Sequence, residues 1–466
     1  MAHSLVGYWE HNKMDDAEGT ERQLTSGTTN HILSNANVWS SDGQWIYYDV
    51  RSDAAGSEFD GTRIERIHVA TGEVEVIYRS WHQACVGVVT ANPVANEVVF
   101  IHGPENPTAD WRYSASHRRG VIVRPSHRDA ASNKATTVDA RDLTPPFTPG
   151  ALRGGSHVHT FSPDGKWIAF TYEDHVLASQ GDVGAHQRNR RAIGISIPAD
   201  NFAGGMVSVP KSHDRSHDGS HFSVVVTELH DHPRPGSDEI CRAIEDAWIG
   251  IDGYVHSNGT CQRRAIAFQG EVVTENNSVI REVFVVDLPD DPTRTGKGPL
   301  EGTATTRPMP PAGVVQRRLT YTANHKFPGI EGPRHWLRSS PDGSQIVFLK
   351  RDDSGVVQLW TVNPSDGQTT MLTKNQHDIA SAFTFSPNGR WISHVMDASV
   401  CVTNTETGDT KRLTSPSRDE TTPRPEACVF STDGQKIAYI RRLPVKTADG
   451  SLRSFNEIFL CHFTTH

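Results

Sequence analysis

The residues best suited to chemistry gather in one stretch of the sequence, between positions 157 and 191. This stretch combines histidine, tyrosine and arginine at close spacing: His157, His159, Tyr172, His175, Arg188, Arg190 and Arg191. Imidazole and phenol groups transfer protons, and guanidinium groups bind carboxylates or sulfates in a bidentate manner. The combination is typical of a site for an anionic substrate.

A predicted hairpin brings these residues together. A strand over 158–162 (VHTFS) leads into the turn Pro163-Asp164-Gly165, and a second strand over 166–172 (KWIAFTY) runs back. Proline presets φ and glycine permits a positive φ, so the chain reverses tightly here. The start of the first strand and the end of the second must then lie at one edge, opposite the turn, with the arginine-bearing loop beside them.

The same hairpin recurs along the chain and indicates a repeat fold. Copies lie at 39–49, 160–172, 338–350, 384–396 and 429–441, and a degenerate copy without the Asp-Gly pair lies at 90–103. The turns at Asp342, Asn388 and Asp433 are evenly spaced, at the period of a four-stranded propeller blade. A second marker, an apolar residue followed by threonine, ends the strands at 142–144, 318–320, 371–373 and 412–414.

Counting these units predicts an all-β, seven-bladed β-propeller of four-stranded antiparallel blades, with residues 1–466 as one domain. Six units carry the turn copies, and the fourth unit is expected to use strands over 221–229, 263–272, 282–288 and 314–321. The final unit has only three strands, and the missing one is found at 21–25 (ERQLT). We therefore expect the N-terminal strand to complete the last blade and close the ring. An insertion at about 230–262 is assigned to blade 4.

Applying the hairpin geometry to every unit predicts one rim of polar residues. These are His82, His102, Tyr172, Arg188, His221, His335, Lys350 and His377, in addition to His157, His159, His175 and Arg191. Any one histidine is more often an ordinary surface or hydrogen-bonded residue. Several histidines that converge with tyrosine and arginine at one mouth favour a substrate site.

Three reaction types could use such a rim. Serine nucleophile catalysis is disfavoured because the sequence has no G-x-S-x-G motif. Glycoside hydrolysis needs two facing carboxylates, whereas Asp49, Glu173 and Asp174 fit solvated loops better. β-Elimination at a uronic acid needs a cation to neutralise the carboxylate, a base for the α-proton and an acid for the leaving oxygen. Histidine, tyrosine and arginine supply all three groups.

Several stretches also resemble a known group of proteins. Residues 139–177, 234–240, 263–272, 313–322 and 333–343 are similar to a family of bacterial propeller proteins, which in turn resemble the seven-bladed ulvan lyases. Those lyases cleave a sulfated rhamnose–uronate polymer by β-elimination. The resemblance implies that His82, His102 and Tyr172 include the base and the acid and that Arg188 binds the carboxylate. Arg190 and Arg191 are alternatives for that arginine.

A metal ion is a further expectation. His230, His232, Cys241 and His256 lie in the predicted insertion with Cys261, and histidine and cysteine are ligands of tetrahedral Zn²⁺. Their spacing matches no standard zinc motif, so an unliganded loop is an equal alternative. We expect any zinc here to be structural and to lie on the face opposite the rim, and the resemblance to ulvan lyases supports it. No organic cofactor is expected.

Composition limits the partners and the location. The net charge of −9 gives no basic field for nucleic acid, and no apolar run is long enough to span a membrane. The N-terminus lacks an apolar signal region, so the protein is either cytosolic or, as we favour, a mature secreted or periplasmic form. We expect a monomer that binds an anionic polysaccharide. The rival functions are a non-catalytic periplasmic propeller that binds glycan or protein, and a metal-dependent oligogalacturonate lyase.

Overall fold

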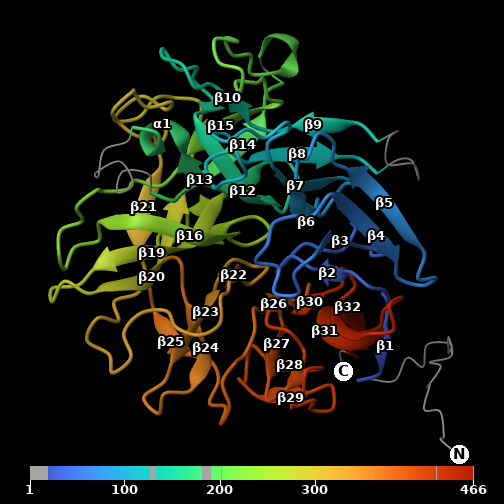
Figure 1. Cartoon of the computed structure of the whole chain (residues 1–466). Coiled ribbons are helices and arrows are strands. Elements are labelled where there is room, and N and C mark those ends of the chain that lie inside the picture. The colour runs from blue at the N-terminus through green and yellow to red at the C-terminus, as the bar shows by residue number, and fades with distance from the viewer. Residues whose placement is uncertain (1–18, 126–132, 181–189, 201, 427, 465–466) are drawn as a thin grey trace, which may run out of the picture.

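The predicted fold class is confirmed by a computed structural model, which describes residues 19–125, 133–180, 190–200, 202–426 and 428–464. Seven four-stranded antiparallel sheets surround a central axis as the blades of a propeller (Figure 1). Helical structure in this part of the chain is limited to α1 (His175–Ala178) and the 3-10 turn η2 (Ala203–Gly205). No helix among these residues is long and apolar enough to cross a membrane.

The blades follow one another in chain order, each from its inner to its outer strand. Blade 1 contains β2 (Asn30–Ile32), β3 (Trp45–Arg51), β4 (Arg63–His68) and β5 (Val74–Arg79). Blade 2 contains β6 (Val86–Ala91), β7 (Val98–His102), β8 (Arg119–Val123) and β9 (Ala135–Thr137). Blade 3 contains β12 (Gly154–Phe161), β13 (Ile168–Asp174), β14 (Ala192–Pro198) and β15 (His221–Val225). Blade 4 contains β16 (Ile240–Trp248), β19 (Ala265–Val273), β20 (Val279–Asp287) and β21 (Val315–Arg318).

The remaining blades complete the ring. Blade 5 contains β22 (Arg338–Ser339), β23 (Ile346–Arg351), β24 (Val357–Val362) and β25 (Thr369–Met371). Blade 6 contains β26 (Thr384–Phe385), β27 (Trp391–Met396), β28 (Ser399–Asn404) and β29 (Thr410–Arg412). Blade 7 contains β30 (Cys428–Phe430), β31 (Lys436–Lys446), β32 (Leu452–His462) and β1 (Glu21–Gln23). Two short ribbons pair β10 (Ala140–Arg141) with β11 (Ala151–Leu152), and β17 (Tyr254–Val255) with β18 (Cys261–Gln262).

The repeated hairpin turn has a local chemical cause. In blade 3, Ser162 Oγ donates to Asp164 Oδ1 at 2.5 Å and accepts a hydrogen bond from the Trp167 backbone N–H at 2.9 Å. Gly165 takes a φ of 70°, which side chains disfavour. The same serine bonds recur at Ser40, Ser340, Ser386 and Ser431. We call this pair of serine hydrogen bonds the serine clasp, and each one fixes a hairpin turn at the same end of the ring. We call that end the turn face and the opposite end the rim face.

The Leu-Thr marker also has a structural cause. Thr320 accepts the Val283 backbone N–H at 2.9 Å, just beyond the last residue of β21. Thr25, Thr373 and Thr414 accept the equivalent N–H groups of their blades. The hydroxyl thus extends the pairing of each outer strand by one bond. The copy at 142–144 is an exception, because it lies in the loop after β10 while β9 is the outer strand of blade 2.

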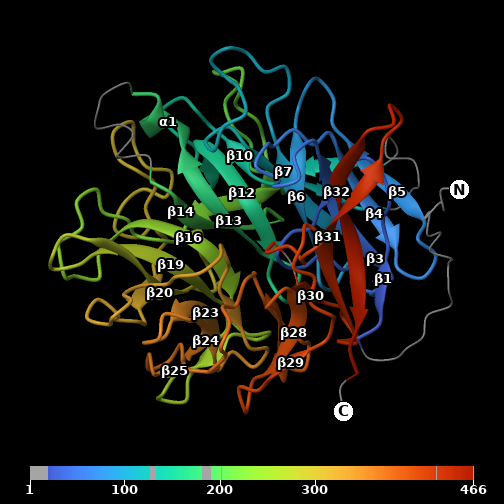
Figure 2. The ribbon, with the colours of Figure 1, turned by 60° about the horizontal axis from the view of Figure 1, so that its bottom comes forward.

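The N-terminal strand closes the ring, as the sequence predicts. β1 pairs antiparallel with β32, and Figure 2 shows it beside the long strands of blade 7. Thr25 Oγ1 donates to Glu457 Oε2 at 2.7 Å, and the Glu457 side chain is fully buried. Arg441 Nη2 lies 2.6 Å from Glu21 Oε1. Side-chain bonds therefore fasten the closing strand as well as the backbone ladder.

The strand assignment for blade 4 was wrong at its first strand. Residues 221–225 form β15, which pairs with β14 as the outer strand of blade 3. The inner strand of blade 4 is β16, within the stretch assigned to an insertion, and the small ribbon of β17 and β18 follows it. The apolar run HFSVVV suits a buried inner strand, whereas ICRAIEDAW contains the charged residues Arg242, Glu245 and Asp246. These charged residues interrupt the apolar pattern, so the sequence did not indicate an inner strand here.

Backbone strain marks one side of the central channel. The inner strands of blades 2, 3 and 4 each contain a bulge, and the bulges contain Val88, Val158 and Glu245 at φ 55°, 54° and 56°. A positive φ is a genuine outlier for the β-branched valines. Such strain concentrates at functional sites. It therefore directs attention to the rim face of blades 2 to 4.

We expect Thr25→Val to destabilise the ring closure. Valine has the shape of threonine but leaves buried Glu457 and the Ile458 N–H each short of one bond, which costs about 1–3 kcal/mol of the free energy of unfolding. Denaturant titration measures the loss. The matched control is Thr62→Val at an exposed position, where we expect no change. Equal stability of the two variants would contradict a closing role for Thr25.

Candidate functional site

A pocket rich in arginine opens on the rim face of blades 3 to 5. It encloses about 410 Å³. Its wall is formed by the start of β14, the rim ends of β16, β19 and β20, and the loop that enters blade 5. The polar lining residues are Arg191, Arg242, Glu245, Gln269, Arg281, Glu331, Arg334 and His335. Blade-to-blade loops and strand ends thus converge at one place, as the hairpin geometry predicts.

The pocket arginines differ in how fully they are neutralised. Arg191 Nη2 lies 2.6 Å from Glu173 Oε1, and Arg334 Nε lies 2.9 Å from Glu245 Oε1. Arg242 and Arg281 instead share Glu271 Oε1, each at 3.6 Å, beyond a direct hydrogen bond. Two guanidinium groups with one carboxylate retain the capacity to bind an added anion.

A second group of rim residues is centred on Arg118, which bonds to Tyr113 and lies near His157. Arg118 Nη1 donates to the Tyr113 hydroxyl at 3.3 Å, and Tyr113 stacks on Phe59 with ring centroids 4.5 Å apart. In the part of the chain that the structure describes, Arg118 has no carboxylate partner, and its buried Nε has no hydrogen bond. Arg118, together with Arg191 and Arg334, lies close enough to His157 to lower the pKa of that imidazole.

The environment fixes the protonation of these groups. Burial, followed by the charge of Arg118, holds the pKa of His157 well below its usual value, so the ring is neutral at neutral pH. Its Nδ1 atom is buried without a hydrogen-bond partner among the described residues. Burial raises the pKa of Tyr113, which keeps its proton. A neutral imidazole, a protonated phenol and a cation are the groups that β-elimination requires.

The two histidines of blade 2 occupy the predicted rim but differ in environment. The buried His102 is hydrogen-bonded at both nitrogens, since Nδ1 donates to the Gly103 carbonyl at 2.7 Å and Nε2 accepts from the Tyr78 hydroxyl at 3.0 Å. Burial lowers its pKa to about 4. His82 lies exposed in the loop before β6. Neither nitrogen of His102 is left for a substrate in this arrangement.

Tyr172 is part of a buried ion-pair network in blade 3. Its side chain is 2% exposed, and its hydroxyl donates to Asp174 Oδ2 at 3.0 Å. Arg153 Nε reaches the same oxygen at 2.8 Å. Burial raises the pKa of Tyr172 well above its ordinary value. This phenol holds the Asp174 carboxylate, and it is not among the residues that line the pocket. Arg188 lies outside the described residues.

Three other predicted residues lie at the rim with hydrogen bonds inside the protein, although the buried Nδ1 of His159 has no partner among the described residues. His335 Nδ1 donates to the Pro333 carbonyl at 2.8 Å and Nε2 accepts the Leu349 N–H at 3.2 Å. His159 Nε2 lies 2.9 Å from Ser156 Oγ, and Lys350 Nζ donates to the Arg351 carbonyl at 3.0 Å. These three side chains support the loops around the site.

His175 and His221 lie in different surroundings. His175 begins α1 at the rim face, where its Nδ1 lies 3.0 Å from His117 Nε2 beside the ring of Trp111. His221 begins β15 at the turn-face end of blade 3, so its predicted place on the rim was wrong. The error follows from the strand assignment of blade 4, because β15 runs in the opposite direction to an inner strand at that position.

The proposed metal ligands do not converge. His230 and His232 lie in the rim-face loop before β16, Cys241 lies on β16, and His256 lies on the turn face between β17 and β18. Cys241 Sγ donates to the Glu271 carbonyl at 3.7 Å, and the His256 ring contacts Tyr254. Among the residues described, no three histidine, cysteine or acidic side chains are arranged to hold a metal ion. These four residues do not fit the predicted zinc site.

The fold and this pocket define a seven-bladed β-propeller with an arginine-rich rim pocket, and comparisons place it in a family. A family model described as "Protein of unknown function (DUF3748)" matches residues 85–217. The chain is 44% identical over 423 residues to the "Uncharacterized protein YidR" of Escherichia coli (strain K12), covering 90% of this chain and 94% of that protein. The chain belongs to the YidR family.

Solved structures share the architecture at low identity. An oligogalacturonate lyase in complex with manganese is 10% identical, with a TM-score of 0.52 over 95% of this chain and 93% of that one. An oligogalacturonate lyase from Vibrio parahaemolyticus is 9% identical, with a TM-score of 0.50 over the same shares, 95% and 93%. At these identities the likeness concerns the fold alone.

Tyr113, Arg242, Arg281 and Arg334 were not predicted from the sequence as site residues, whereas Arg118 was expected only as one of several arginines that could bind sulfate or carboxylate. Tyr113 and Arg118 belong to the long loop between β7 and β8, whose path over blade 3 follows no hairpin rule. Arg334 lies within the stretch PRHWLRSSPDG, which already marked the family resemblance. That stretch was the available signal for the loop into blade 5.

Stability should fall in acid because several rim histidines are held neutral. Burial lowers the pKa of His102 and His335 from 6.5 to about 4. Below pH 6.5 these histidines bind protons in the unfolded chain but stay neutral in the folded protein. The free energy of unfolding therefore decreases as the pH falls toward 4. We expect the thermal midpoint to decrease over this window, and to decrease less steeply for His335→Gln, which cannot titrate. Parallel pH profiles for the two proteins would rule out this contribution of His335.

Proposed function

We propose that this protein is a polysaccharide lyase that cleaves a uronate-containing saccharide by β-elimination at the rim pocket. The sugar carboxylate binds to Arg118 with help from Arg191 and Arg334. His157 acts as the base and Tyr113 as the acid. The proposal keeps the reaction that the sequence predicts but assigns it to a different group of side chains.

The observation that carries the proposal is the unneutralised charge of Arg118. This guanidinium has no carboxylate partner among the described residues, and a neutral histidine and a protonated tyrosine flank it. Burying a charge without its partner is costly, so the arrangement is best explained by an anionic ligand that supplies the missing carboxylate. Burial lowers the pKa of Arg118, and Glu173 lies near enough to oppose that shift, but Glu173 is already paired with Arg191 at 2.6 Å. Arg334 and Arg351 pair with Glu245 and Glu331.

The residues would act in sequence on one sugar unit. Arg118 pairs with the carboxylate and stabilises the charge that develops when the α-proton leaves. His157 Nε2 takes that proton, because Nδ1 is buried. The electron pair forms the new carbon–carbon double bond as the glycosidic bond breaks. Tyr113 gives its proton to the leaving oxygen, and solvent then returns the proton from His157 to Tyr113.

Among uronate polymers we propose a sulfated, ulvan-like substrate of rhamnose sulfate and glucuronate or iduronate. Arg242 and Arg281, which share one carboxylate, support this choice because they leave room for a second anion. The same substrate implies export, and we propose a secreted or periplasmic location. Fractionation of cells that produce the protein tests the location.

A non-catalytic glycan-binding propeller is the second candidate. It is favoured by the close pairing of Arg191 and Arg334 with their glutamates, which suits a binding surface as well as a reacting one. An assay with ulvan and with oligogalacturonate, each with and without added Mn²⁺, separates these functions. New ultraviolet absorbance from an unsaturated uronate indicates a lyase, and binding without absorbance indicates the second candidate.

Paired tyrosine variants test which phenol is the acid. We expect Tyr113→Phe to lower kcat on ulvan by roughly 10²–10⁴-fold, because the leaving oxygen loses its proton donor. His157→Ala should cause a loss of similar size. Tyr172→Phe is the matched control, since its hydroxyl only holds Asp174, and it should cost about 1 kcal/mol of stability with turnover retained.

Two results would overturn the assignment. Loss of turnover in Tyr172→Phe, with an unchanged fold, would return the acid to the position implied by the ulvan lyase resemblance. Full activity in both Tyr113→Phe and His157→Ala would remove this group of residues from the mechanism.

A further inference from the structure

We infer that Tyr321 is the stacking platform of an outer sugar-binding subsite, where a distal pyranose unit of the same saccharide chain binds. The inference rests on the proposed function and extends it to substrate length. Tyr321 lies in the rim-face loop just after β21, the outer strand of blade 4. Its side chain is 62% exposed, although tyrosine usually buries much of its ring.

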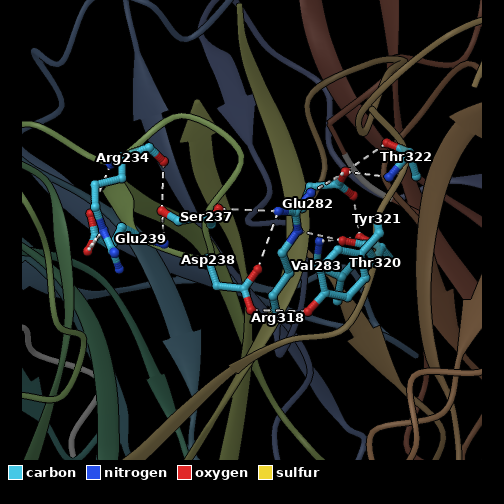
Figure 3. Close-up of polar contacts among 10 residues, drawn as sticks. All are labelled: Arg234, Ser237, Asp238, Glu239, Glu282, Val283, Arg318, Thr320, Tyr321 and Thr322. Carbon is cyan, nitrogen blue, oxygen red and sulfur yellow. Dashed lines mark hydrogen bonds and ion pairs between the residues drawn. The ribbon is translucent and has the colours of Figure 1, made fainter. Parts of the chain in front are cut away.

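Polar contacts hold this exposed ring on one face and at its hydroxyl group (Figure 3). The Arg318 guanidinium lies over one face of the ring, 4.4 Å from its centroid. The hydroxyl donates to Asp238 Oδ2 at 3.1 Å, and Arg318 Nη1 lies 3.5 Å from the other oxygen of that carboxylate. One face of the ring is therefore covered by a cation, and the exposed area of the side chain belongs to the rest of the ring.

A buried carboxylate fixes the backbone on both sides of Tyr321. Glu282 is 1% exposed and accepts hydrogen bonds from the Thr320 hydroxyl, the Thr322 hydroxyl at 2.9 Å and the Thr322 N–H at 2.7 Å. Arg318 Nη2 reaches the same carboxylate at 3.2 Å. The ring is thus oriented before any ligand arrives, which lowers the entropy lost on binding.

The loop that carries Asp238 is also braced. Arg234 Nε donates to Glu239 Oε1 at 2.8 Å, the Arg234 N–H donates to Oε2 at 2.9 Å, and Ser237 Oγ donates to the Arg234 carbonyl at 2.7 Å. Arg318 also donates to the Ser237 carbonyl at 3.4 Å. The tip of the tyrosine therefore meets a fixed acceptor.

The surroundings favour a sugar as the ligand. A hollow of about 490 Å³ adjoins the ring and is lined by polar groups that include Gln316, Arg317, Arg318 and Asp238. A pyranose ring presents C–H groups to an aromatic face, whose π-electrons attract their positive charge, and its hydroxyls bond to polar side chains around it. These polar groups have partners within the protein. Their remaining donor and acceptor capacity favours a ligand rich in hydroxyl groups over a flat apolar one.

The platform and the rim pocket lie on either side of one strand, β20. Arg281 of the pocket and Glu282 of the platform are consecutive residues of β20, so their side chains lie on opposite faces of one strand near its rim end. The loop that contains Gly329 and Ile330 is hydrogen-bonded to both regions. The Ile330 N–H donates to the Arg281 carbonyl, and the Gly329 N–H donates to the Thr322 hydroxyl. A saccharide bound in the pocket can therefore cross the rim edge of blade 4 to Tyr321.

The test compares affinity for a long and a short chain. Ulvan hexasaccharide and ulvan disaccharide are titrated by calorimetry into His157→Ala protein, which keeps the substrate intact, with and without Tyr321→Ala. We expect Tyr321→Ala to raise the hexasaccharide Kd roughly tenfold, so that the ratio of the two Kd values approaches one. Tyr321→Phe should retain most of the preference. Val255→Ala, at a similarly exposed turn-face position, should leave the ratio unchanged.

The outcomes separate the subsite from the reaction. An unchanged Kd ratio in Tyr321→Ala, with both saccharides still bound, overturns the subsite and leaves the lyase proposal standing. Cleavage of neither saccharide by the wild-type protein defeats the lyase proposal while the Kd ratio still reports on Tyr321. Absence of binding by either saccharide overturns both. A lower thermal midpoint in Tyr321→Ala together with an unchanged ratio would assign the ring to stability alone.

Discussion

Each blade of this propeller reverses at a serine clasp, and the placement of the site depends on that reversal. Ser162 bonds both to the turn aspartate and to the N–H of the returning strand. These two hydrogen bonds determine where the hairpin turns. They therefore determine which residues lie at the other end of the ring. With five such turns on one face, the strand ends and the blade-to-blade loops meet on the other. The polar side chains at these strand ends and loops therefore share the rim face.

Charge balance then distinguishes one sector of the rim. Around most of the ring, arginines are matched by carboxylates, as Arg441 is by Glu21 in blade 7. In blades 2 to 4 the matching is incomplete, since Arg242 and Arg281 share Glu271 and Arg118 meets only a phenol within bonding distance. The same positive field, added to burial, keeps His157 neutral. A neutral imidazole therefore lies beside Arg118, which has no carboxylate within ion-pair distance among the described residues.

The strained inner strands belong to the same sector. Val88, Val158 and Glu245 hold positive φ angles inside bulges of three consecutive blades. A regular strand would place His157 and Glu245 in a different register with respect to the channel, because one inserted residue moves the following side chains to the other face. The fold stores this strain where the candidate site lies, while blades 5 to 7 have short inner strands.

The sequence alone determined the architecture. The clasp turns, the Leu-Thr markers and the strand at 21–25 are local patterns with local causes, so they predicted seven blades and the closure correctly. The sequence also determined the types of side chain in the site, and it placed His157, Arg191 and His335 near it.

The sequence did not determine which side chains pair with one another. Tyr172 and Tyr113 look alike in sequence, yet one is buried against Asp174 and Arg153 and the other faces Arg118. The inner strand of blade 4 was missed because its charged residues broke the apolar pattern. Only the tertiary structure decided these points, because burial and ion pairing depend on side chains far apart in the chain, whose distances no local spacing encodes.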